Sequence, residues 1–62
     1  MEKIVFKWYS IGHGFYGYFQ NIMDIKELRA ASFADLKYQA EKIFRDRFPQ
    51  TSVLEFVEDP KA

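Results

Sequence analysis

The stretch KIVFKWYSIGHGFYGYFQNI, residues 3–22, decides the fold of this 62-residue chain. It contains two runs rich in β-branched and aromatic residues, separated by the triplet GHG at 12–14. Such runs on either side of a glycine-bracketed turn are typical of a β-hairpin. Glycine at both ends of the triplet allows the positive φ values that the twist of a hairpin requires. The sequence therefore predicts antiparallel strands at 3–11 and 15–22.

Two registers of this hairpin are open. A loop at 12–13 puts Trp8 opposite Gly17, so that the indole ring covers the glycine, whereas a loop at 13–14 puts Trp8 opposite Phe19. Both registers give the same two faces, because side chains alternate along a strand. One face carries Ile4, Phe6, Trp8, Phe15, Gly17 and Phe19. The other face carries Val5, Lys7, Tyr9, Ile11, Tyr16 and Tyr18.

A helical pattern follows between Ser32 and Phe48. Ser32 with Asp35 resembles an N-terminal cap, in which the hydroxyl accepts an amide hydrogen and the acid lies near the positive end of the helix dipole. Pro49 ends the helix, and the run TSVLEFVED at 51–59 predicts a final strand. The apolar residues recur at steps of three and four and form one stripe, Phe33, Leu36, Ala40, Ile43 and Phe44.

The segment KELRAA, 26–31, fits two structures. Asp24 and Glu27 are able to cap an early helical turn that continues into the later helix, whereas the alternation within the segment fits a short third strand. We favour the strand, because Ser32 is a natural helix start and a helix of about 25 residues is long for a small domain.

The predicted fold class is α+β, a single domain over 1–62 with a small antiparallel sheet and the element order β-β-β-α-β. A right-handed crossover through the helix places the last strand beside the first, in the sheet order 3-2-1-4. The helix then covers the face that carries Ile4, Phe6, Trp8, Phe15 and Phe19. The opposite face is left open, with Val5, Tyr9, Ile11, Tyr16, Tyr18 and Ile22 beside Lys7 and Gln20.

Composition argues against several classes of function. With no cysteine and one histidine, the chain can form neither a disulfide nor a structural zinc site with four nitrogen or sulfur ligands. Nine basic and nine acidic residues give zero formal charge, whereas a dedicated nucleic-acid binder carries a basic excess. The opening MEKIVFKW is too short and too charged for a signal peptide, and no apolar run approaches about 18 residues. We expect a cytoplasmic protein with no membrane partner and no cofactor.

No catalytic or metal site is predicted. His13 is the sole side chain with a pKa naturally near neutrality, but Ser10 and Tyr16 do not form a triad-like set with it, so we expect a solvated turn residue. Carboxylates on outer strands usually keep a sheet soluble and block edge-to-edge pairing. We assign that role to the acids of the predicted outer strands, Glu2, Glu55, Glu58 and Asp59. The chain is therefore predicted not to be an enzyme.

The aromatic residues of the open face are the main functional signal. One interpretation is purely structural, because tyrosine tolerates a half-exposed strand well. The other is an interaction surface, because a contiguous aromatic patch marks such sites and tyrosine is enriched at interface hot spots. We predict a protein-binding site, for a larger partner or for a second copy of the chain, formed by Lys7, Tyr9, Ile11, Tyr16 and Tyr18.

An alternative function uses the same tyrosines to stack the bases of single-stranded nucleic acid. The phosphates would then meet Lys3, Lys7, Lys26 and Arg29. Zero net charge disfavours this alternative, since phosphate neutralisation supplies most of the non-specific affinity for nucleic acid.

The stretch LRAASFADLKYQAEKIFRDRFPQTSVLEFVED, 28–59, resembles the strand, A-x-S-x-x-D, helix and strand that end many small bacteriophage proteins. Among these are the phage-encoded inhibitors of bacterial RNA polymerase, and antitoxins of the HicA/HicB type share the strand–strand–helix–strand order. The matching positions are structural, Ala30, Ser32, Asp35, Ala40 and the strand 53–57. The resemblance covers about half of the chain and implies a non-enzymatic accessory protein of a phage or mobile element that binds and inhibits or modulates a host enzyme.

Overall fold

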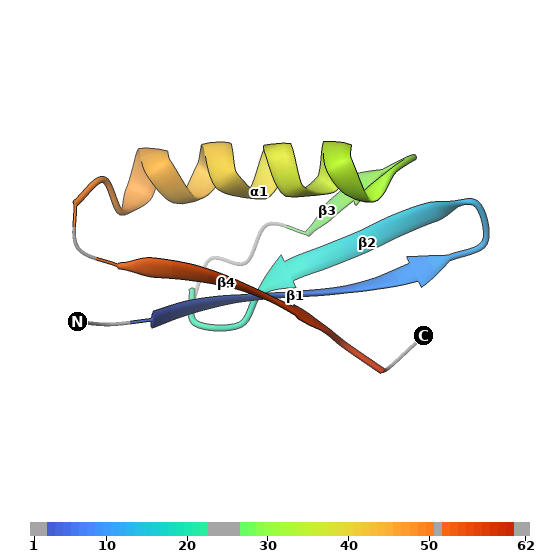
Figure 1. Ribbon diagram of the computed structural model, residues 1–62, viewed down its shortest axis with the longest axis horizontal. Coiled ribbons are helices and arrows are strands. Elements are labelled where there is room, and N and C mark those ends of the chain that lie inside the picture. Colours follow the sequence, from blue (N-terminus) through green and yellow to red (C-terminus); the bar gives the residue numbers. More distant parts are fainter. Residues whose placement is uncertain (1–2, 23–26, 51, 61–62) are drawn as a thin grey trace.

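The computed structural model describes residues 3–22, 27–50 and 52–60. The strands are β1 (Lys3–Ile11), β2 (Gly14–Phe19), β3 (Leu28–Ala30) and β4 (Val53–Glu58), and the helix α1 spans Phe33–Arg47. The strands form one sheet in the order β3-β2-β1-β4, and α1 lies across one of its faces (Figure 1). The predicted fold class, element order and strand order are confirmed.

The hairpin adopts the first of the two predicted registers. Trp8 lies opposite Gly17, and Ile11 pairs with Gly14, so the loop consists of residues 12–13. Gly12 has a φ of 55°, which favours glycine at this position. The expectation of a positive φ at Gly14 is wrong. Glycine is favoured at position 14 because the backbone of β3 lies close to it: a Cβ atom there would lie 3.0 Å from the carbonyl oxygen of Ala30.

The ring nearest to Gly17 is that of Phe6 rather than the predicted Trp8. Two atoms of the Phe6 ring occupy the position that a Cβ atom at Gly17 would need. Trp8 packs instead against Phe33 of α1, with ring centroids 4.4 Å apart, and against Phe15 at 5.8 Å. The phenylalanine reaches its diagonal neighbour across the strands, because a bare glycine leaves a gap that a large ring fills.

The segment between the hairpin and the helix forms a strand. Leu28–Ala30 pairs antiparallel with β2, which confirms the strand interpretation for the middle of 26–31, although residue 26 lies outside the described residues. The helix begins after Ser32, whose Oγ accepts a hydrogen bond from the Asp35 amide at 3.2 Å. This cap satisfies an amide that has no partner inside the helix and separates the strand from the helix, as predicted.

The sheet is mixed, because β4 runs parallel to β1. The predicted antiparallel arrangement holds for β1 with β2 and for β2 with β3. It is wrong for β1 with β4. The physical reason is the crossover. A helical connection returns the chain in the direction of β3, and β3 runs parallel to β1 because each is antiparallel to β2.

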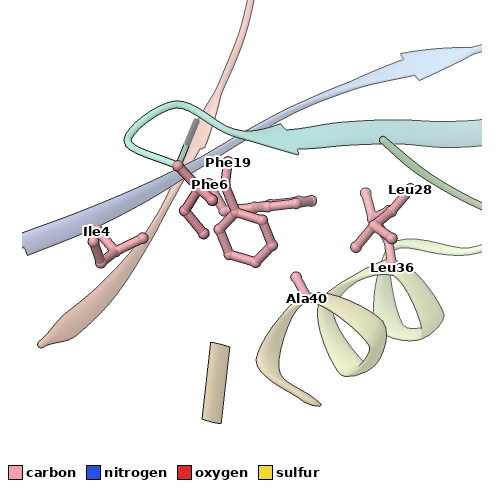
Figure 2. Close-up of a cluster of buried hydrophobic side chains, with 7 residues drawn as sticks. Ile4, Phe6, Phe19, Leu28, Leu36 and Ala40 are labelled. Carbon is pink, nitrogen blue, oxygen red and sulfur yellow. The ribbon is translucent and has the colours of Figure 1, made fainter. Parts of the chain in front are cut away.

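The core lies between α1 and the covered face of the sheet (Figure 2). Phe6, Phe19 and Leu36 are fully buried, and each such side chain contributes roughly 1.5–3 kcal/mol by leaving water. Trp8 and Phe15 pack against this cluster, as predicted. The buried cluster is completed by Ile4, Ile22, Leu28 and Ala40.

Ile22 lies on the opposite side of the sheet from the one that the alternation predicts. The pattern predicts the open face, but Ile22 is buried in the core with 8% of its surface exposed. β2 ends at Phe19, and residues 20–21 form a turn that is held by a 2.8 Å hydrogen bond from the Val5 amide to Oδ1 of Asn21. Because the strand has ended, the two-residue alternation no longer applies at Ile22.

Candidate functional site

The open face of the sheet brings all five predicted site residues together. Tyr9 lies directly across from Tyr16, and Lys7 directly across from Tyr18, on the two central strands. Ile11 follows at the hairpin end of β1 with 49% of its surface exposed, and the other four side chains are half-buried. We call this set of Lys7, Tyr9, Ile11, Tyr16 and Tyr18 the tyrosine face.

Tyr16 lies at the centre of a stack of side chains that runs across three strands. Its ring lies 5.1 Å from the ring of Tyr9 on β1. On its other side, the guanidinium of Arg29 on β3 lies 5.2 Å from the ring centroid, in a cation–π arrangement. The neighbouring carboxylate of Glu27 raises the pKa of Tyr16 from 10.0 to about 12, because it accepts from the neutral phenol and repels the phenolate.

Tyr18 is tied to the end of β4. Its hydroxyl donates a 2.5 Å hydrogen bond to Oδ2 of Asp59, which raises the pKa of Tyr18. Asp59 is buried, with 9% of its surface exposed, and its amide donates to the Trp8 carbonyl at 2.6 Å. The prediction that Asp59 is a solvated edge acid is therefore wrong. Asp59 helps to position Tyr18, and the sequence held no signal for this contact, because it depends on the parallel direction and the register of β4 beside β1.

Lys7 is the cation of the tyrosine face and lies at the end opposite Ile11. Its cross-strand neighbours are Tyr18 on β2 and Val57 on β4. It makes no hydrogen bond or ion pair with any residue that the structure describes. Lys3 differs, because its Nζ forms a 2.7 Å ion pair with Glu55. The side chain of Lys7 is half-buried, and its charge is not offset by an ion pair with a described residue.

The charges of the open face balance. Its described cations are Lys3, Lys7 and Arg29, and its described carboxylates are Glu27, Glu55 and Asp59. Of the cations proposed to meet phosphates, Lys26 lies outside the described residues. Lys3 is paired with a carboxylate and Arg29 is stacked on a tyrosine. Such a surface attracts phosphates weakly, because each carboxylate offsets a cation.

A shallow depression of about 300 Å³ lies at the hairpin end of the tyrosine face. The residues that line it are mostly apolar or aromatic, with one cationic residue: Ile11, Gly14, Phe15, Tyr16, Arg29 and Ala30. Ile11 and Tyr16 belong to both the depression and the tyrosine face, so the two form one continuous surface.

The remaining candidate chemistry is not assembled. His13 is exposed at the turn and makes no hydrogen bond with a described residue. Within 3–22, 27–50 and 52–60, no three acidic or histidine side chains gather closely enough to hold a metal ion. Among the acids assigned to the outer strands, Glu58 is exposed, and Glu2 lies outside the described residues. The described helix is not long and apolar enough to cross a membrane.

Comparison with known proteins adds no relative to this description. No family model, no curated protein and no solved structure matches the chain.

Proposed function

We propose that this chain is a small, non-enzymatic protein-binding module and that the tyrosine face is its binding surface. The observation that carries the proposal is a contiguous aromatic patch on the uncovered side of the sheet, with Ile11 exposed at one end and Lys7 at the other end, where it has no ion pair with a described residue. Exposed patches of this kind mark interaction sites, and tyrosine supplies a large contact area at low conformational cost.

Single-stranded nucleic acid is the second candidate for the same face. The stack of Tyr9, Tyr16 and Arg29 offers flat surfaces for bases. The three carboxylates on this face weigh against it, because they would lie close to the phosphates of a bound strand. A protein partner with mixed charges fits the balanced surface better.

The resemblance of residues 28–59 to small phage proteins suggests the kind of partner. On that basis the chain is an accessory protein of a phage or mobile element, and its partner is a host enzyme that it inhibits or modulates. The cysteine-free composition supports action in the reducing cytoplasm. A second copy of the chain is a further partner that the same face could hold.

The test is affinity capture from bacterial lysate, with and without nuclease, using the tagged chain and two variants. Tyr9→Ala removes a ring from the tyrosine face. Tyr38→Ala is the matched control, because Tyr38 lies on α1 with 68% of its surface exposed. We expect a nuclease-resistant protein band that is lost with Tyr9→Ala and retained with Tyr38→Ala. Bands that all disappear with nuclease would instead establish nucleic-acid binding.

A further inference from the structure

The outer edge of β4 presents unpaired backbone groups. The Asp59 amide donates to the Trp8 carbonyl, and in a parallel ladder the hydrogen-bonding direction alternates from one residue to the next. The amides and carbonyls of residues 53, 55 and 57 therefore point toward β1. The amides and carbonyls of Leu54, Phe56 and Glu58 point away from the sheet. β4 is an edge strand, and these outward groups make no hydrogen bond within the part of the chain that the structure describes.

A groove runs beside this edge. α1 packs on β2 and β3, so its flank and the covered face of β4 leave between them a groove of about 290 Å³. The apolar part of the lining is Phe44 from the helix with Leu54 and Phe56 from the strand. Leu54 and Phe56 therefore contribute both to the groove, through their side chains, and to the free edge, through their amides and carbonyls.

The charged residues of the groove favour an occupant that carries a negative charge. Arg45 forms a 3.5 Å ion pair with Glu41, so these two groove residues offset each other. The Nζ atom of Lys37 lies 5.8 Å from the centroid of the Phe56 ring, and Lys37 has no ion pair among the described residues. The groove thus has one uncompensated positive charge beside an apolar floor.

We propose that the edge of β4 binds an extended segment of a partner protein as a fifth strand. The segment pairs its backbone with Leu54, Phe56 and Glu58, as in β-strand addition. A strand added there lies about 4.8 Å beyond β4, with alternate side chains facing the helix. The segment places an apolar side chain in the groove and a carboxylate near Lys37.

A second copy of the chain fits this edge poorly. Pairing two β4 strands would put the four carboxylates of Glu55 and Glu58 from both copies onto adjacent strands, and like charges that fall opposite each other destabilise a sheet. A partner segment of different sequence with one carboxylate avoids this repulsion and complements the charge of Lys37. This site lies on the other side of the sheet from Tyr9 and does not depend on the function proposed for the tyrosine face.

The probe is a fluorescent hexapeptide of alternating valine and threonine with one central aspartate, measured by fluorescence anisotropy and by amide chemical shifts. We expect saturable binding, with the largest shifts at Leu54, Phe56 and Glu58. Glu58→Pro removes an outward amide while keeping the ladder with β1. Loss of one hydrogen bond should weaken binding roughly three- to tenfold, whereas Glu58→Gln, the matched control, should bind as the wild type does.

Two further measurements keep the proposal open to refutation if Glu58→Pro fails to fold. A peptide N-methylated at alternate residues should lose binding to the unaltered protein, and Lys37→Ala should remove the preference for aspartate over lysine at the centre of the peptide. Absence of saturable binding, shifts confined to the tyrosine face, or equal binding of the N-methylated peptide would overturn the proposal. Tyr9→Ala should not affect peptide binding at the edge of β4. The proposals for this edge and for the tyrosine face can therefore be refuted separately.

Discussion

Single contacts explain how residues that look alike in the sequence come to differ. Tyr16 and Tyr18 both follow the same alternation on β2, yet one is stacked beneath Arg29 and the other is bonded to Asp59. The alternation predicted their shared face, because that depends on strand geometry alone. It could not predict their partners, because those come from β3 and from the end of β4, whose register the local pattern does not contain.

Removing the hydroxyl of Tyr18 should destabilise the fold. In Tyr18→Phe the buried carboxylate of Asp59 loses its phenol donor, and a buried acceptor that loses a donor raises the free energy of the folded state. We expect a lower free energy of unfolding in denaturant titrations. Tyr38→Phe serves as the control and should leave that free energy unchanged, because Tyr38 is exposed on the helix. Equal free energies of unfolding for Tyr18→Phe and Tyr38→Phe would show that the hydrogen bond to Asp59 does not stabilise the fold.

Alkaline pH should weaken the fold through the same two tyrosines. The pKa of Tyr16 is raised from 10.0 to about 12, and that of Tyr18 is raised as well. Below pH 10 both phenols are protonated in the folded and the unfolded chain. Between pH 10 and about 12 the unfolded chain releases protons that the folded chain keeps, so stability falls as pH rises. Denaturant titrations should show a shallower fall over this window for Tyr16→Phe than for Tyr9→Phe.

The secondary-structure elements were largely predictable, because local rules govern them. The glycine-bracketed turn predicted the hairpin, and the apolar stripe behind the Ser32 cap predicted α1. Errors arose where an element ended or where non-neighbouring strands met. Ile22 lies past the end of β2, and the direction of β4 follows from the crossover rather than from its own residues. Short-range patterns hold no information on either point.

The cap of α1 gives a test at this scale. Ser32→Ala removes the acceptor for the Asp35 amide and should lower the free energy of unfolding by about 1 kcal/mol. Ser10→Ala is the matched control on an exposed strand position and should change it little. If the two substitutions have the same effect on the denaturation midpoint, the cap does not stabilise the helix start.

The whole molecule is a sheet with one face committed to its core and the other left open. The helix α1 spans the covered face, where Phe6, Phe19 and Leu36 are fully buried. No second helix precedes or follows it within the described residues, so the aromatic side chains of the open face stay half-exposed. The placement of the five residues of the tyrosine face on one side of the sheet was predictable, because alternation and one covering helix suffice to place them. The balance of charge around them was not, since Glu27, Glu55 and Asp59 reach that face only through tertiary pairing.

The central claim is that the tyrosine face binds a protein, and the affinity of the captured partner for Ile11→Asp tests it most directly. Ile11 is 49% exposed at the edge of that face, so the substitution should leave the fold intact while placing a charge in the interface. Tyr38→Asp on the helix is the control. We expect about thirtyfold weaker binding for Ile11→Asp, as for a hot spot of about 2 kcal/mol. Affinity should change little between about 50 and 200 mM salt. Wild-type affinity in Ile11→Asp, or a steep loss of affinity with salt, would contradict the account.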